Sequence, residues 1–118
     1  MLEKATANWT AVALMIKLAK RSGYRQTCHN HAVARSAGQL DSWGYKVWAD
    51  IRGYPKPQKL CVDGDCRIPD IIAKKGRRMQ VIEFETPDSV EKDWEQHRVL
   101  RTWARRNGAE FHRRVCDV

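Results

Sequence analysis

The chain has 118 residues, and its 22 lysines and arginines against 14 aspartates and glutamates give a formal net charge of +8 at pH 7. The length fits one domain with its own core, and 42% hydrophobic residues with five tryptophans exclude an intrinsically disordered chain. The longest apolar run, 11–19, contains Lys17 and falls short of the roughly 20 residues that span a bilayer. No signal-peptide cleavage site follows it. We therefore expect a cytoplasmic protein that is not inserted in a membrane, with nucleic acid as its first candidate partner and an anionic lipid surface as the second.

The first half of the chain predicts two helices and a strand. Apolar residues dominate 9–21 and recur at helical intervals over 30–43. Residues 45–51 then alternate between apolar and polar, which is typical of a strand. The prolines of 53–64 predict a loop.

The second half predicts a β-hairpin, a helix and a last strand. The arms of the hairpin are 68–73 and 78–85, joined by a turn within 74–77. A capping-box pattern opens a helix over 88–106, and a short strand follows over 109–115. The order α-α-β-β-β-α-β predicts an α/β fold in which a mixed sheet packs against helices.

Three carboxylates of this hairpin should share one face of the sheet. Glu83 and Glu85 are two residues apart on a strand, so their side chains point to the same side about 7 Å apart. Asp70 lies on that face whether the turn is 76–77 or 75–76, and the first turn places it opposite Glu83. Carboxylates this close repel one another unless a cation lies among them, and oxygen ligands suit Mg²⁺, Mn²⁺ or Ca²⁺.

Pro69-Asp70 and, after a spacer, Glu83-Phe84-Glu85 resemble the motif of the PD-(D/E)XK nuclease superfamily, also called restriction-endonuclease-like. The resemblance covers residues 28–116, because the core of that superfamily has the order α-β-β-β-α-β with the motif on its second and third strands. It implies a restriction-endonuclease-like mixed β-sheet flanked by helices. The whole chain, 1–118, would then be one nuclease-like domain in which residues 1–27 add an N-terminal helix.

The resemblance also implies a divalent-metal-dependent endonuclease or phosphodiesterase that acts on DNA. A junction, a nick and an end all stay open as its substrate, because each would attract the same basic charge. Asp70, Glu83 and Glu85 would hold Mg²⁺ or Mn²⁺, which activates a water molecule. Glu85 occupies the position where the superfamily usually has lysine, so it would accept the proton of the water or hold a second metal ion. Lys92, in the next helix, would supply the missing ammonium group.

Polar residues on the two core helices are further candidates for the site. Gln96 matches a glutamine that some branches of the superfamily direct at the site, and His97 falls in the middle of the apolar face: Val90, Trp94, Leu100 and Ala104. Alternatively, Gln96 and His97 only satisfy backbone groups or each other. On the first core helix, Asp41 is the candidate for an extra ligand.

Basic residues are expected to contact the phosphates of DNA. They lie at the hairpin tip, in the proline-containing loop and on the last helix: Lys74, Lys75, Arg77, Arg78, Lys56, Lys59, Arg98 and Arg101. Phosphate contacts position a protein on the backbone without reading sequence, so the same charge would also attract RNA.

The four cysteines leave three alternatives open. Unlinked thiols are favoured in a reducing cytoplasm, whereas a Cys61–Cys66 disulfide is expected if the host is a hyperthermophile. A zinc site would combine these two cysteines with two of the upstream residues Cys28, His29 and His31.

Two other functions fit the same sequence. A catalytically weakened nucleic-acid-binding module with the same fold is favoured by the missing lysine, and a viral or mobile-element accessory protein by the small size. The apolar helix over 9–21 would pack on the core or form a homodimer, in which each copy acts on one strand of the DNA.

Overall fold

The computed structural model describes residues 25–87, 89 and 93–116, so the predicted helix over 9–21 and Lys92 lie outside the described residues. The described elements are α2 (Arg25–Ser42), β1 (Lys46–Ala49), β2 (Leu60–Val62), β3 (Asp65–Arg67), β4 (Ile71–Lys75), β5 (Arg78–Glu85), α3 (Trp94–Arg106) and β6 (Glu110–Val115). No helix in this part of the chain is long and apolar enough to cross a membrane.

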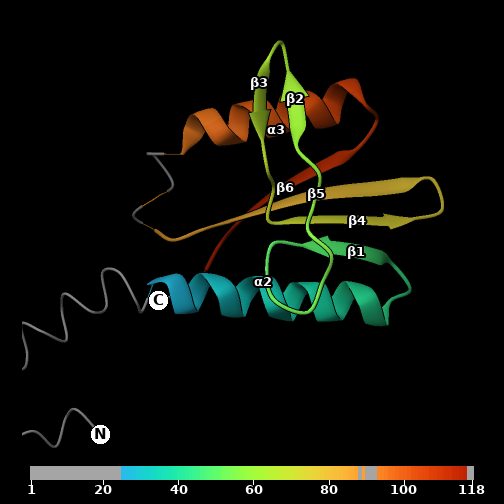
Figure 1. Ribbon diagram of the computed structural model, residues 1–118, viewed down its shortest axis with the longest axis vertical. Coiled ribbons are helices and arrows are strands. Elements are labelled where there is room, and N and C mark those ends of the chain that lie inside the picture. Colours follow the sequence, from blue (N-terminus) through green and yellow to red (C-terminus); the bar gives the residue numbers. More distant parts are fainter. Residues whose placement is uncertain (1–24, 88, 90–92, 117–118) are drawn as a thin grey trace, which may run out of the picture.

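The four longer strands form one mixed sheet in the order β1-β4-β5-β6. β1, β4 and β5 are antiparallel neighbours, whereas β6 lies parallel to β5 after a crossover through α3. Figure 1 shows α2 on one side of this sheet and α3 on the other. The predicted α/β class, with a mixed sheet flanked by helices, is confirmed.

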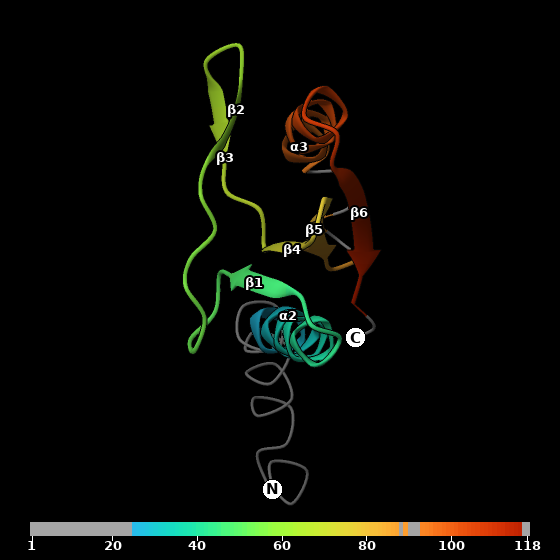
Figure 2. The same ribbon diagram turned by 90° about the vertical axis from the view of Figure 1, so that its right-hand side faces the viewer.

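Each face of the sheet is covered by a separate apolar core, and Figure 2 shows the two helices that lie over them. The core toward α2 contains Val33, Ala37, Leu40, Ile71, Ala73, Ile82 and Phe84. The core toward α3 contains Leu60, Ile72, Val81 and Leu100. Because side chains alternate along β5, Glu83 and Glu85 share the face of Val81, toward α3.

The turn between β4 and β5 fixes the register that positions the acidic residues. Lys75 pairs with Arg78, so the turn consists of Gly76 and Arg77 alone. Gly76 has a φ of 60°, which a two-residue hairpin with glycine in the first position requires. This is one of the two predicted registers. Ile71 pairs with Ile82, so the preceding residue, Asp70, lies opposite Glu83.

The segment 53–64, predicted as a loop, contains a strand that the sequence analysis missed. β2 pairs with β3 across the two-residue turn Asp63-Gly64, and both turn residues have positive φ values, 50° and 85°. Cys61 and Cys66 face each other in this hairpin and form a disulfide. The prediction of unlinked thiols is therefore wrong for this pair, and these sulfurs are not available for a zinc site. Cys28 and Cys116 are thiols.

Helix α3 differs from its prediction at the start. It begins at Trp94 rather than near 88, because Ser89 instead forms a turn in which its N–H donates to the Thr86 carbonyl at 3.0 Å. With this start, Trp94 is 58% exposed, which corrects its predicted place on the buried face. The buried residues of α3 are His97, Val99, Leu100 and Ala104. The end at Arg106 agrees with the prediction, since Gly108 follows it with a φ of 70°.

Candidate functional site

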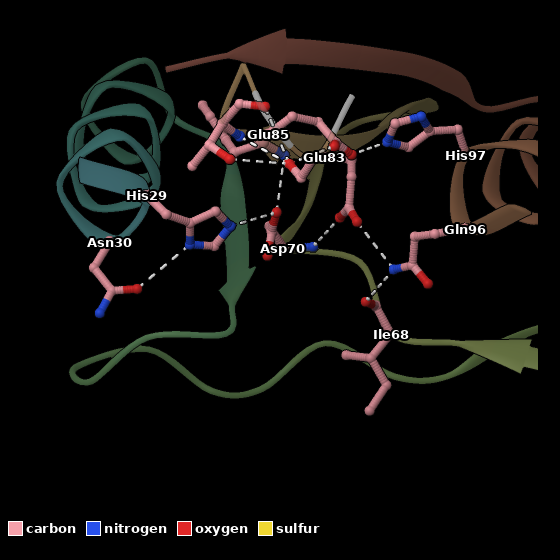
Figure 3. Close-up of polar contacts among 11 residues, drawn as sticks. His29, Asn30, Ile68, Asp70, Glu83, Glu85, Gln96 and His97 are labelled. Carbon is pink, nitrogen blue, oxygen red and sulfur yellow. Dashed lines mark hydrogen bonds and ion pairs between the residues drawn. The ribbon is translucent and has the colours of Figure 1, made fainter. Parts of the chain in front are cut away.

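The candidate site lies at the end of the sheet where the central strand β4 begins and the central strand β5 ends, between the first turns of α2 and α3 (Figure 3). The strands contribute carboxylates and the two helices contribute imidazole and amide groups: Asp70, Glu83, Glu85, His29, Gln96 and His97. Figure 3 shows His29 approaching from α2 and Gln96 and His97 approaching from the opposite side, on α3.

The carboxylate of Asp70 is held from two directions. Its Oδ2 accepts a hydrogen bond from the backbone N–H of Phe84 at 2.8 Å and lies 3.1 Å from Nε2 of His29. The hydrogen bond to Asp70 raises the pKa of His29 to about 9, although partial burial opposes the shift. His29 is therefore an imidazolium at neutral pH and forms an ion pair with Asp70.

The carboxylate of Glu83 lies between Asp70 and α3. Its Oε1 accepts from the backbone N–H of Asp70 at 3.1 Å, and its Oε2 accepts from Nε2 of Gln96 at 2.9 Å. Burial, followed by the negative charge of Asp70, raises the pKa of Glu83 to about 9. Gln96 also donates to the carbonyl of Ile68 at 3.1 Å, which fixes its amide between the two acceptors. The predicted residue Gln96 is thus in direct contact with Glu83.

Glu85 is paired with His97 rather than with Asp70. Its carboxylate contacts Nε2 of His97 and accepts from the hydroxyl of Ser89 at 2.8 Å. Burial raises the pKa of Glu85 and lowers the pKa of His97, so the histidine is a neutral imidazole. Nδ1 of His97 is buried and has no hydrogen-bond partner among the described residues.

The ligating atoms of Glu83, Glu85 and His97 all lie within 4.8 Å of one another. Asp70 adjoins this group through its backbone N–H, which donates to Glu83, whereas its carboxylate faces His29 and the N–H of Phe84. Two of the three predicted carboxylates, Glu83 and Glu85, therefore lie together with His97, and Asp70 lies beside them, paired with His29. Oxygen and imidazole nitrogen donors of this kind fit a divalent cation.

Neither His29 nor His97 is among the residues predicted to act at the acidic cluster, and Asp41 was predicted there but lies elsewhere. His97 had a signal, because a histidine in the middle of an apolar face needs a polar partner. His29 had none, since its contact with Asp70 depends on how α2 packs on the sheet. Asp41 is exposed at the other end of α2, about 18 Å along the helix axis from His29, so its prediction as an extra ligand is wrong.

The predicted phosphate-binding residues lie on the surface around the sheet. The tip of the β4–β5 hairpin, with Lys74 and Arg77 exposed, is about 17 Å from Asp70 along the strand. Several of the remaining residues have partners within the protein: Arg78 with Glu110 (2.6 Å), Lys56 with Asp50 (3.7 Å), Arg98 with Glu95 (3.0 Å), Lys75 with the Trp43 carbonyl (2.6 Å) and Arg101 with the Phe111 ring. Exposed pairs of this kind contribute little to stability, so phosphates can compete for the cations.

A groove between α2 and β6 adds basic residues that the sequence analysis did not select for phosphate binding. It has a volume of about 500 Å³, and its lining includes His31, Arg35 and Arg114. A second cavity of about 240 Å³ shares Arg114 with it and extends it toward Trp43, whose side chain is 55% exposed. The basic groove thus runs from the first turns of α2 to its end.

No family model, curated protein or solved structure matches this chain. The resemblance to the PD-(D/E)XK superfamily stays a prediction from the sequence, and the function is inferred from the geometry of the site.

Proposed function

We propose that this protein is a divalent-metal-dependent endonuclease of the PD-(D/E)XK type that hydrolyses phosphodiester bonds in DNA. The observation that carries the proposal is the position of Asp70, directly before β4, beside Glu83 on β5: the backbone N–H of Asp70 donates to Oε1 of Glu83 at 3.1 Å, and Glu85 lies two residues further on. The elements around them, α2-β1-β4-β5-α3-β6, follow the order α-β-β-β-α-β once the β2–β3 hairpin is set aside as an insertion.

The charge of the site supports a bound cation. Burial, followed by the negative charge of Asp70, raises the pKa of Glu83 to about 9. A carboxylate in that position is costly unless a positive charge balances it. The donor set of the three carboxylates fits Mg²⁺ or Mn²⁺, and either ion would lower the pKa of a bound water and neutralise charge on the phosphate.

The protein groups around the carboxylates have separable roles in this proposal. His29 holds Asp70, and Gln96 holds Glu83, so both carboxylates keep their orientation. Glu85 replaces the usual lysine and is one of the carboxylates that would hold the metal ion, and the hydroxyl of Ser89 orients it.

The basic surfaces support a nucleic-acid substrate. The groove with Arg35 and Arg114 lies along α2, and its lining begins at Thr27 and Cys28 in the first turn of that helix. The cations of the hairpin tip lie at the other end of the sheet. Contacts at both places would hold the phosphate backbone across the protein, with the acidic cluster as the point of cleavage.

The second candidate is a nucleic-acid-binding module of the same fold with a weakened site. One observation favours it: the carboxylate of Glu85, at the lysine position, is already occupied by contacts with Ser89 and His97. A carboxylate held in this way is less available to a metal ion.

Incubation with supercoiled plasmid, a DNA hairpin, a four-way junction and a matched RNA separates the two. The nuclease predicts cleavage of at least one DNA in Mg²⁺ or Mn²⁺, no cleavage in EDTA, and loss of cleavage in Asp70→Asn. If wild type and variant are equally inert while both retard DNA in a gel, the module replaces the nuclease. Cleavage of the RNA alone would contradict the assignment of DNA as substrate.

A further inference from the structure

Three buried side chains from two elements meet on the side of the sheet that faces α3. Glu83 and Glu85 come from the end of β5, and His97 comes from the first turn of α3. Their exposed fractions are 7%, 2% and 3%, and their ligating atoms lie within 4.8 Å of one another. Most water is thus excluded from a set of two carboxylates and one imidazole.

Each carboxylate of the set has a partner that orients it. Gln96 donates to Oε2 of Glu83 at 2.9 Å, and Ser89 donates to Oε2 of Glu85 at 2.8 Å. Metal ligands in proteins are typically held by such outer hydrogen bonds, which fix the direction of their lone pairs. The other oxygen of Glu85 faces His97.

His97 directs one ring nitrogen at this set. Its Nε2 contacts the carboxylate of Glu85, and the ligand atoms of His97 and both carboxylates lie within 4.8 Å of one another. Burial lowers the pKa of His97, so its imidazole is neutral and offers a nitrogen lone pair. A cation shared by these three side chains would replace the contact between Nε2 and Glu85 with bonds to both groups.

We propose that His97 is a metal ligand and that, with Glu83 and Glu85, it binds one first-row transition-metal ion, Mn²⁺ in preference to Mg²⁺. Imidazole nitrogen suits transition metals, whereas Mg²⁺ prefers an all-oxygen set. The inference rests on the proposed function because it concerns the same centre, and it deepens it by naming the nitrogen ligand and the class of metal.

Binding of Mn²⁺ to the metal-free full chain tests the proposal without any substrate. We expect one Mn²⁺ per chain by electron paramagnetic resonance, with Mg²⁺ displacing it only at about tenfold or higher excess. Pulsed spectra of the wild type should contain ¹⁴N coupling from a coordinated imidazole. His97→Gln should lose this coupling and bind Mn²⁺ about 10- to 100-fold more weakly.

Two matched histidine variants serve as controls. His29→Gln changes the partner of Asp70, and His112→Gln changes a histidine that pairs with Glu110 on β6. Both should keep the ¹⁴N coupling. The proposal is overturned if the wild type binds no Mn²⁺ or shows no ¹⁴N coupling, and this measurement does not depend on the folding of any variant. It is also overturned if the coupling survives in His97→Gln and disappears in His29→Gln.

DNA cleavage measured on the same samples separates this inference from the proposed function. A protein that binds Mn²⁺ through His97 but cuts no DNA contradicts the nuclease and supports the metal site. A protein that cuts DNA in Mg²⁺ without a His97-dependent coupling supports the nuclease and contradicts the metal site.

Discussion

Nε2 of His29 on α2 lies 3.1 Å from Oδ2 of Asp70, the residue that precedes β4. This ion pair connects the first turns of α2 to the end of the sheet that carries the acidic cluster. Because the same carboxylate also accepts from Phe84 on β5, one side chain joins three elements of the fold.

The His29–Asp70 pair should contribute stability that depends on pH. The pKa of His29 rises from 6.5 to about 9, so its contribution is fully present below pH 6.5 and is lost as the pH rises through about 9. His29→Gln should therefore lower the free energy of unfolding by about 1–2 kcal/mol at pH 6, a value discounted because the histidine is partly exposed. Urea unfolding at pH 6 and pH 10 measures this, and an equal loss at both values would contradict the ion pair.

Glu83 should have a stronger effect on the metal-free protein. Its pKa rises from 4.5 to about 9, so the stability that the neutral carboxyl allows is complete below pH 4.5 and declines as the pH rises through about 9. Glu83→Gln removes this decline. The free energy of unfolding of the variant, relative to that of the wild type, should therefore increase by about 2–3 kcal/mol from pH 5 to pH 8. Urea unfolding of both proteins in EDTA at pH 5 and pH 8 measures this difference. Glu95→Gln, on the surface of α3, is the matched control and should run parallel to wild type.

Gln96 is a positioning residue in this account. Gln96→Ala removes the amide that orients Glu83, so cleavage and Mn²⁺ affinity should both fall about 10- to 100-fold. A fall in thermal stability with unchanged Mn²⁺ affinity would instead indicate a purely structural role. Glu95→Gln, one residue earlier, should leave both quantities at the wild-type level.

The Cys61–Cys66 disulfide should matter for stability and not for the site. It closes a loop with a sequence separation of 5, for which the chain-entropy relation gives about 2 kcal/mol. Replacing both cysteines with serine should lower the free energy of unfolding by about that amount and leave Mn²⁺ affinity unchanged. A matched loss of metal binding would show that the β2–β3 hairpin supports the centre through α3.

The basic groove predicts a measurable salt dependence. If Arg35 and Arg114 each neutralise one phosphate, the double change to glutamine should reduce the slope of log affinity against log salt by about 2. Arg105→Gln with Arg106→Gln, on exposed α3 positions, removes the same charge away from the groove. An equal reduction in both double variants would mean that net charge, rather than the groove, attracts DNA.

Much of the fold could be predicted because the local signals are strong. Period-two alternation fixed which side chains of β5 face α3, and Gly76 limited the turn to two registers. The β2–β3 hairpin was missed because its strands are short, although Asp63-Gly64 is a typical two-residue turn.

The sequence predicts which side chains of one strand share a face, but it does not predict which side chains of different elements come into contact. The positions of Glu83 and Glu85 follow from a local period, whereas the contacts of His29 and His97 depend on how each helix is rotated against the sheet. That rotation is set by packing over the whole core, and a single sequence does not contain it in any short pattern.

The most direct measurement of the central claim is the rate of plasmid cleavage in Mn²⁺ by wild type, Asp70→Asn and Asp41→Asn. The two variants remove the same charge, one at the acidic cluster and one at the exposed far end of α2. The nuclease predicts cleavage by wild type and Asp41→Asn at similar rates and a loss of at least 100-fold, or about 3 kcal/mol of transition-state stabilisation, in Asp70→Asn. Equal rates in all three proteins, or none in any of them, would contradict it.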